Sequence, residues 1–493
     1  MEAVDVIKMK KQFILLVISC IAFNVLFAQV DPAQSSYKKK VLETAEVDFL
    51  MSYYTQDGKH ASVTGGIGNE KLTDMTPTIV VTIPLNVDDV LTVDAGISAY
   101  TSASSSNLDP FDASGASNGE GSDDDDRRVF ASDAKGSPWV ESSGASSKDV
   151  WTSINANYSH SSDDRNSIWT ANVGFASEYD YSSIGFGGGF TKLFNEKNTE
   201  FGIKGQVYID SWNPRYPTEL DSYLEAGQNL NNGFFADIDI LNQSGDIIDK
   251  DGVQVWSPLN TTLLNDKSRN SYSVSFSFSQ ILSKNAQFSI FFDLVQQKGW
   301  LANPMQRVYF ADRSNYYVGN ASSIDNYTSP RNTDVFQLAD DLERLPTSRF
   351  KIPIGARLNY FINESVSLRT YYRYYFDDWG IKSHTVNLEV PIKFADGKFT
   401  LYPNYRFYNQ NAADYFAPFE SHSSSSKFYT SDYDLSKFDS HQYGLGFKYT
   451  DIFARLKVFK LGLKSVDLRY SIYNRSDGLD SNIVSAGIKF VLD

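Results

Sequence analysis

Cysteine and methionine are scarce in this chain, and long apolar runs are almost absent. The 493 residues include one cysteine, Cys20, and five methionines. Cys20 lies in an N-terminal segment with the features of an export signal. If ordinary cleavage removes this segment, the mature chain has no cysteine, and neither disulfides nor thiol chemistry can contribute. Beyond that segment no window offers about 18 consecutive apolar residues, so the sequence contains no helical membrane span.

Positive charge is also in short supply. The chain has 45 Lys and Arg against 60 Asp and Glu, which gives a net charge of −15 and a pI of about 4.9. A protein that grips the phosphate backbone of nucleic acid needs the opposite balance, so nucleic acid is not an expected partner. Acidic side chains on solvated loops account for the excess, with a cation-favouring interior as the alternative.

Aromatic residues, by contrast, are abundant. They make up 14% of the chain, with 34 Phe and 30 Tyr. This profile is typical of many strands that have one apolar and one polar face, with aromatic girdles where lipid meets water. The Tyr and Phe clusters at 371–376 and 402–408 fit such girdles, and a carbohydrate platform is the alternative for the same residues.

The first thirty residues have the pattern of a cleaved export signal. Lys8, Lys10 and Lys11 precede an apolar stretch over 13–27, and a polar stretch follows Ala28. We predict a signal peptide over 1–29, with Met9 as an alternative start, and a periplasmic N-terminal segment over 30–42. A lipoprotein motif that would lipidate Cys20 is the alternative, although the apolar stretch continues past this cysteine.

Alternation of apolar and polar residues, in segments of about ten, dominates residues 43–493. It is plainest where Tyr272, Val274, Phe276 and Phe278 alternate with serines over 271–279. Short Asn-, Asp- and Gly-rich connections at 195–198, 283–286, 363–364 and 395–397 alternate with long ones near 101–149, 213–269, 299–348 and 410–439. Tight turns at one end and long loops at the other are the pattern of bacterial outer-membrane barrels, in which the turns face the periplasm.

The sequence therefore predicts an all-β protein: a closed antiparallel transmembrane β-barrel over 43–493, located in the outer membrane. We predict 16 strands, with 14 or 18 as alternatives, because 43–68 reads as one strand and a turn or as two strands. The count must be even if both termini are periplasmic, and the sheet must close because backbone groups in lipid need partners. Outer-membrane lipid and the barrel assembly machinery are the implied partners.

Charged residues within the predicted strands are the candidate functional positions. Each would be costly if it faced lipid, so we expect it to face the lumen or an interface. Clusters of strand arginines set the field at the constriction of a pore, and pairing with carboxylates that plug the lumen is the alternative. The candidate lumen-lining residues are Arg357, Arg369, Arg373, Arg406 and Arg469.

No motif carries strong evidence of a cofactor or of catalysis. Asp123, Asp124, Asp125 and Asp126 are weak candidates for Ca²⁺, because consecutive carboxylates do not point at one centre. The glycines of 185–189 lack the Lys-Ser/Thr of a phosphate loop, and the five histidines show no metal-ligand spacing. With no G-x-S-x-G sequence present, we expect neither a cofactor nor an enzyme, although an outer-membrane enzyme with a Ser/His or carboxylate pair is kept as a third class.

Three stretches resemble a family of uncharacterised Gram-negative outer-membrane barrels known only as a domain of unknown function. They are 63–74 (VTGGIGNEKLTD), 401–418 and 428–438 (FYTSDYDLSKF). The resemblance covers nearly the whole mature chain. It implies outer-membrane placement and transfers no site residues, and an association with envelope redox proteins is implied by the resemblance alone.

Two functions follow as expectations. The first is a passive channel for small solutes or ions, through a lumen lined by the polar strand faces. The second is a plugged barrel that acts as a binding or assembly partner for envelope proteins. The segment 430–438 fits either an inward plug or an ordered external cap.

Overall fold

The computed structural model describes residues 40–102, 149–213, 216–259, 267–327 and 335–492. The predicted signal peptide, Cys20 and Asp123 to Asp126 lie outside these residues. Within them, no helix is long and apolar enough to cross a membrane. The chain divides into two units, Met1–Lys40 and Val41–Asp493, and the fold described below belongs to the second unit.

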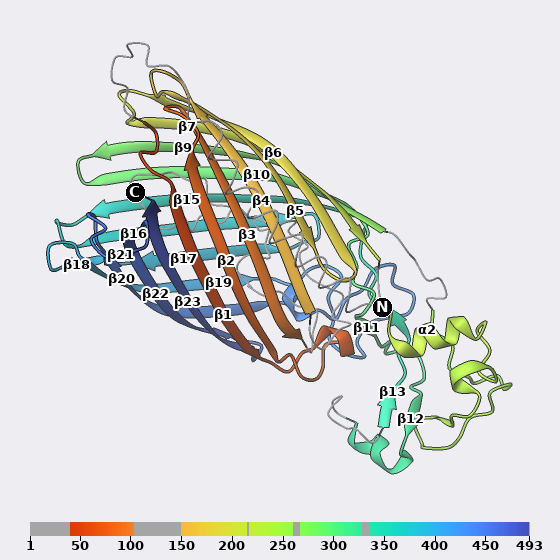
Figure 1. Cartoon of the computed structure of the whole chain (residues 1–493). Helices are drawn as coiled ribbons and strands as arrows, with labels where there is room; N and C mark the ends of the chain where they lie inside the picture. Colours follow the sequence, from red (N-terminus) through yellow and green to blue (C-terminus); the bar gives the residue numbers. More distant parts are fainter. Residues whose placement is uncertain (1–39, 103–148, 214–215, 260–266, 328–334, 493) are drawn as a thin grey trace. The chain divides into compact units, whose positions relative to one another are not determined.

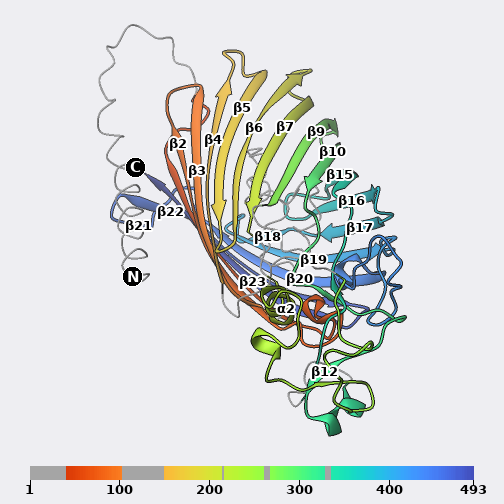
Figure 2. The same cartoon turned by 90° about the vertical axis from the view of Figure 1, so that its right-hand side faces the viewer.

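Val41–Asp493 forms a closed antiparallel β-barrel of 16 strands, which confirms the predicted fold class and strand count (Figures 1 and 2). Each strand pairs with the next along the chain. Two short strands also join the sheet: β18 (Ile392–Phe394), which continues β17 past Val390-Pro391, and β21 (Lys457–Val458). The 16 strands are β1 (Glu46–Asp57), β2 (Leu72–Pro84), β3 (Asp89–Ser102), β4 (Asp149–Ser161), β5 (Ser167–Ser177), β6 (Tyr181–Phe194), β7 (Thr199–Trp212), β9 (Lys267–Ser283), β10 (Ala286–Gly299), β15 (Ser348–Phe361), β16 (Ser367–Asp377), β17 (Lys382–Glu389), β19 (Phe399–Gln410), β20 (Phe438–Thr450), β22 (Leu461–Arg475) and β23 (Asp480–Leu492).

The barrel closes through β1 and β23. Their antiparallel register runs from Glu46 opposite Val491 to Asp57 opposite Asp480. Phe49 packs edge-on against Phe490 on the outer side of this seam, with ring centroids 6.0 Å apart. The ambiguous region 43–68 is thus one strand followed by a loop, and the last predicted strand begins three residues earlier than the alternation at 483–492 indicated.

The two ends of the barrel differ, as the connection lengths predicted. At the turn end, which also holds the ends of β1 and β23 nearest the termini, the connections are 85–88, 162–166, 195–198, 284–285, 362–366, 395–398 and 451–460. The strand ends that flank the four long predicted connections all lie at the opposite loop end. That end also has three tight connections, 178–180, 378–381 and 476–479, so it is not uniformly long.

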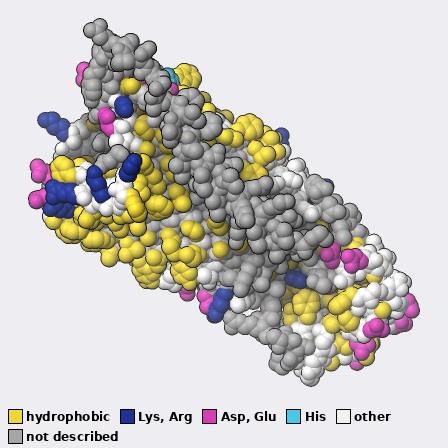
Figure 3. All heavy atoms as spheres, in the orientation of Figure 1, with side chains coloured by type: hydrophobic (Ala, Val, Ile, Leu, Met, Phe, Trp, Pro, Cys, Tyr) yellow, Lys and Arg dark blue, Asp and Glu magenta, His cyan; other side chains and the backbone are white. Residues whose placement is uncertain are grey.

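The outer face of the barrel is apolar around its circumference. Alternate residues of the strands place large hydrophobic side chains outward, and many are about half exposed, including Trp169, Ile184, Tyr443, Leu445 and Leu468. Figure 3 shows hydrophobic side chains on the visible flank and a group of Lys and Arg side chains at the turn end. The residues that alternate with the outward hydrophobic ones along each strand, such as the serines of β9, point inward. This is the arrangement expected for strands between lipid and an enclosed polar interior.

The described parts of 58–71, 216–259, 300–347 and 411–437 fold together at the loop end, and we call them the cap. The cap contains the helix α2 (Thr218–Glu225) and two small sheets. One sheet pairs β11 (Arg307–Val308) with β14 (Asp341–Leu342), and the other joins β8 (Ile240–Leu241), β12 (Tyr317–Gly319) and β13 (Val335–Gln337). Four 3-10 helices complete it: η1 (Ser62–Thr64), η2 (Gly233–Phe235), η3 (Ala321–Asn326) and η4 (Tyr433–Leu435).

The cap has hydrophobic cores of its own. The largest brings Leu220 of α2 together with Phe235, Trp256 and Leu342, so residues from 216–259 and 300–347 share one core. The indole N–H of Trp256 donates to the Ala339 carbonyl at 2.9 Å. Loops without internal packing seldom bury so many aromatic side chains, so the cap is an ordered structure.

Candidate functional site

All five arginines selected from the sequence occupy inward positions. Arg357 lies on β15, Arg369 and Arg373 on β16, Arg406 on β19 and Arg469 on β22. Their strand neighbours point outward, as the exposure of Leu358, Tyr372 and Leu468 indicates. These strands are close together around the barrel, so the arginines fall on one arc of the inner wall.

Two of the arginines share one carboxylate. Arg369 Nη1 lies 3.0 Å from Glu389 Oε1, and Arg469 Nη1 lies 3.3 Å from Glu389 Oε2. Arg469 also contacts Asp467 through Nε at 3.1 Å and lies over the Tyr402 ring at 5.0 Å. Part of the predicted pairing with carboxylates therefore occurs within the same arc of the wall. Charge-assisted contacts of this kind hold the guanidinium planes in fixed orientations.

Arg357 lies beside two aromatic rings. Its guanidinium carbon is 5.4 Å from the ring centroids of both Phe291 of β10 and Tyr371 of β16. The two rings are stacked 14° from parallel at 5.7 Å. Gly355 makes room for Phe291, because a Cβ at this position would lie 2.1 Å from the ring. A flat aromatic surface with a cation at its edge results.

Arg373 of β16 and Thr385 of β17 are opposite each other in the sheet. Both residues are buried, with exposed fractions of 4% and 0%. Among the described residues, neither Arg373 Nε nor Thr385 Oγ1 has a hydrogen-bond partner. A buried donor without a partner is costly, so such atoms call for an explanation in the form of water, an ion or a ligand.

Inward charges are segregated between two halves of the wall. The basic arc, on β15 to β23, carries Lys448 and Lys489 in addition to the five arginines, with Glu389 and Asp467 among them. The acidic arc, on β1 to β10, carries Asp48, Asp74, Asp94, Glu200, Asp210 and Asp293, with Lys204 and Arg269 among them. Opposed walls of unlike charge produce a transverse field across a lumen.

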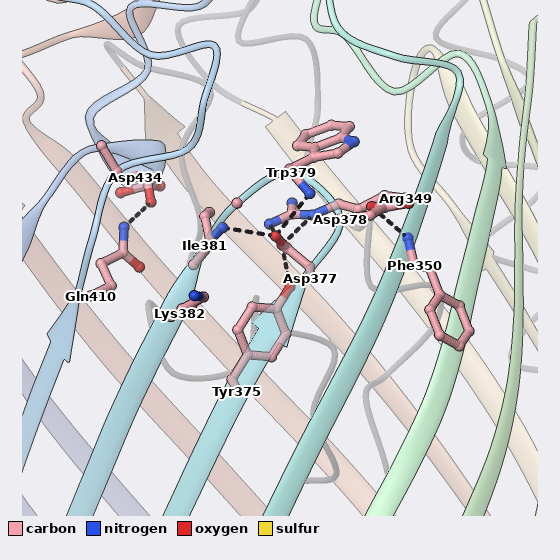
Figure 4. A network of polar contacts seen from close by, with 12 residues as sticks. Arg349, Phe350, Tyr375, Asp377, Asp378, Trp379, Ile381, Lys382, Gln410 and Asp434 are labelled. Atoms are coloured by element: carbon pink, nitrogen blue, oxygen red, sulfur yellow. Dashed lines mark hydrogen bonds and ion pairs between the residues drawn. The ribbon is translucent and has the colours of Figure 1, made fainter.

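A polar network at the loop end ties the cap to the wall (Figure 4). Asp377 accepts from Arg349 Nε at 2.8 Å, from the Tyr375 hydroxyl at 2.6 Å and from the backbone N–H groups of Trp379 and Ile381. The Arg349 guanidinium also lies 4.4 Å from the Trp379 ring. In the same view, Gln410 Nε2 donates to the Asp434 carbonyl at 2.8 Å.

The segment 430–438 contacts the inner wall of the rim rather than standing clear of it. Besides Gln410, Arg475 of β22 donates to the Tyr433 carbonyl at 2.8 Å and pairs with Asp434, and its guanidinium lies 3.9 Å from the Phe438 ring. The Tyr433 ring stacks on His60 of the first loop at 3.7 Å. The segment thus combines the two expectations, since it belongs to an ordered cap and is anchored inward.

Burial perturbs the acids of the cap. Burial and the nearby Asp432 raise the pKa of Glu343 to about 8, and burial raises the pKa of Asp340 and of Asp432 to about 6. Burial also raises the pKa of Glu70 to about 7. The backbone N–H of Asn303 donates to Glu343 Oε2 at 2.6 Å. These carboxyl groups become easier to protonate near neutral pH than ordinary acids.

No arrangement for catalysis or for a metal emerges from the described residues. They hold no group of three or more His, Cys, Asp or Glu suited to a metal ion. His422 and Ser431 are buried and 3.2 Å apart, but His422 Nε2 also faces the Thr430 carbonyl at 3.0 Å and must donate to it. Ser431 Oγ donates to the Ala417 carbonyl instead. This histidine is therefore not placed as a base for Ser431.

The residues missed by sequence reasoning are mostly those of the rim and the cap. Arg349 and Glu343 stand beside or in the connection 300–347, and Asp377 ends β16. Alternation is lost at these places, and the partners of these residues lie on other elements. One sequence feature could have identified two of the rim residues: Arg349 and Lys351 are at the positions of β15 that alternate with outward residues, so they would be expected to point inward. The glycines of 185–189 lie in β6, and a Cβ on Gly187 would lie 2.0 Å from Gln206 Oε1, which agrees with the strand interpretation.

Several solved structures match the chain over most of its length. A bacterial polysaccharide outer membrane secretin matches at 8% identity, with 91% of this chain and 99% of that chain covered and a TM-score of 0.40. A Pseudomonas aeruginosa FadL homologue matches at 11% identity, over 92% and 90% of the two chains, with a TM-score of 0.35. The Pseudomonas putida toluene transporter TodX matches at 9% identity, over 92% and 90%, with a TM-score of 0.35.

Comparison with curated proteins gives no match. A family model described as "Protein of unknown function (DUF3570)" matches residues 15–476, which is most of the chain and includes all five candidate arginines. The chain, a closed 16-stranded antiparallel barrel, therefore belongs to the DUF3570 family.

Proposed function

We propose that the protein is an outer-membrane channel that passes small solutes or ions through the barrel, with the cap controlling entry. One observation carries the proposal: a closed ring of 16 strands turns apolar side chains outward around its circumference and polar side chains inward. A 16-stranded barrel is wide enough to hold an aqueous channel.

The proposed orientation follows from the connections. In bacterial barrels the short turns face the periplasm and the long loops face outward. We therefore assign the turn end to the periplasm and the cap to the outer surface. Solutes from outside would meet the cap first and the basic and acidic arcs afterwards.

The cap supports a second candidate, a barrel that binds a partner at its outer face. Two features of the cap favour this candidate: the internal core around Phe235 and Trp256, and a buried ion pair between Arg307 and Glu219. Loops that merely connect strands do not need such construction. Only this second candidate requires a partner protein in the envelope.

Planar-bilayer recordings test the channel. The purified protein in detergent is added to a planar membrane, and the wild type is compared with Arg307→Ala, which loosens the cap. We expect rare openings from the wild type and frequent ones from the variant. Absence of current from both proteins at every voltage would refute the channel. Crosslinking in outer membranes followed by purification tests the second candidate, which a chain recovered alone would contradict.

A further inference from the structure

The inner wall at the border of the basic arc, on β10 and β15 to β17, carries a group of side chains suited to a ligand with both a negative charge and a flat apolar part. The group consists of Phe291, Arg357, Tyr371, Arg373 and Thr385 on the adjacent strands β10, β15, β16 and β17. The registers place Phe291 opposite Gly355, Gly355 opposite Arg373, and Arg373 opposite Thr385. Arg357 is opposite Tyr371, so the two arginines are diagonal neighbours on one face.

We propose that this group, here called the anion platform, binds a small organic anion with a planar apolar portion, such as an aromatic carboxylate. The inference deepens the proposed channel function by naming a solute class. It rests on the channel proposal only in that the solute would reach the platform through the lumen.

The donors are the first argument. Arg373 Nε–H and the Thr385 hydroxyl are buried, adjacent and without a partner among the described residues. A carboxylate oxygen is an acceptor that both donors can share. Hydrogen bonds from a guanidinium to a carboxylate are shorter and stronger than neutral ones, so the anion is favoured over a neutral analogue.

The flat surface is the second argument. Phe291 and Tyr371 stack nearly in parallel, and Arg357 lies 5.4 Å from each centroid. An aromatic ring gains dispersion and offset stacking from such a surface, whereas acetate gains neither. Gly355 is required here, because any side chain at this position would push Phe291 away from the wall.

Charge around the platform is the third argument. The nearest strands toward β23 add Arg369, Arg406 and Arg469, and the described carboxylates among them, Glu389 and Asp467, are already engaged by Arg369 and Arg469. Of the acids of the acidic arc, Asp293 lies on β10, two residues from Phe291 on the same face, and the others lie on β1 to β7. An anion is therefore drawn to the β15–β19 side of the wall.

Isothermal titration calorimetry of the full-length protein in detergent tests the platform, with benzoate as the probe and acetate and benzyl alcohol as comparisons. We expect saturable binding of benzoate, and weaker binding of the other two because each lacks one of the two recognised parts. Arg373→Met should weaken benzoate binding about tenfold or more, the loss expected when one charged hydrogen bond is removed. Thr385→Val should weaken it by a smaller factor, and Gly355→Ala should remove the preference for benzoate over acetate.

Lys448→Met is the matched control, because it removes a cation of the same arc outside the platform. Its benzoate affinity should stay near that of the wild type. Equal losses in Lys448→Met and Arg373→Met would show that general charge attracts the anion and would overturn the platform. Unchanged binding in Arg373→Met would overturn it as well. Circular dichroism and heat-modified gel mobility establish that each variant is folded.

The binding assay needs no conduction, so the two proposals fail separately. Saturable benzoate binding without current would refute the channel and retain the platform. Current without benzoate binding would retain the channel and refute the platform.

Discussion

Arg307 forms a two-pronged ion pair with Glu219, with Nε 2.6 Å from Oε1 and Nη2 3.1 Å from Oε2. The third nitrogen, Nη1, donates to the Val63 carbonyl at 2.8 Å. One side chain thereby joins three loops of the cap: 58–71, the helix α2 and the segment 300–347. Both partners are nearly buried, so few water molecules replace these contacts if one is removed.

Arg307→Ala should loosen the cap while leaving the barrel intact. Removing one partner of a buried pair leaves the other charge uncompensated and costs about 3–5 kcal/mol. We expect faster cleavage by trypsin within 216–259 and 300–347, with unchanged protection of the strands. Arg455→Ala in a turn at the opposite end is the control and should cleave like the wild type. Equal protection of the cap in both variants would contradict the clamp.

Rising pH should weaken the closed cap through Glu343. Its pKa is about 8 in the cap against an ordinary 4.5, so the closed form favours the protonated acid. The stabilisation is complete below about pH 4.5 and is lost as pH rises to about 8. Conductance or protease sensitivity should therefore increase between pH 5 and 9. In Glu343→Gln the increase should be much smaller. The increase that is left should occur at lower pH, where Asp340, Asp432 and Glu70 lose their protons. A variant that keeps the full wild-type increase would rule out Glu343 as its source.

A charge on the outer face should destabilise the barrel more than the same charge inside. Leu445 is half exposed at the middle of β20, and an arginine there costs about 2–4 kcal/mol in lipid near the midplane. Ser277→Arg, on the inward parity of β9, is the matched variant. Urea unfolding in lipid vesicles should shift to lower urea for Leu445→Arg and shift much less for Ser277→Arg. Equal shifts would argue against contact between Leu445 and lipid.

Asp377→Ala should release the loop-end hairpin of β16 and β17. The variant has no carboxylate to accept from Arg349 and Tyr375 at Oδ2 or from the backbone N–H groups of Trp379 and Ile381 at Oδ1. Hydrogen exchange of Trp379 and Ile381 should quicken, while amides of the 362–366 turn stay unchanged and serve as the internal control. Slow exchange at Ile381 in the variant would contradict this role for Asp377.

Strand number, inward parity and loop placement could be predicted because each depends on neighbours close in sequence. The period of two in 271–279 assigns β9, and the parity of Arg357 and Arg373 follows from the outward Ile354 and Tyr372. The partner of Arg307 could not be predicted, since Glu219 lies 88 positions away in a loop without periodicity. The same holds for Glu343, whose raised pKa depends on burial beneath another loop. Asp123 to Asp126 stay a prediction, as they lie outside the described residues.

Pairing between β1 and β23 also governs how this protein reaches its final form. Lys464 of β22 meets Glu46 of β1 across 418 positions of sequence. β1 and β23 cannot pair with each other until nearly the whole chain has been delivered. Until then the sheet has two open edges, and both expose unsatisfied backbone groups. A chaperone or assembly factor would have to shield both edges throughout that interval. A chain cut short before Asp480 would leave β1 with one bare edge and would be expected to aggregate rather than to form a smaller pore.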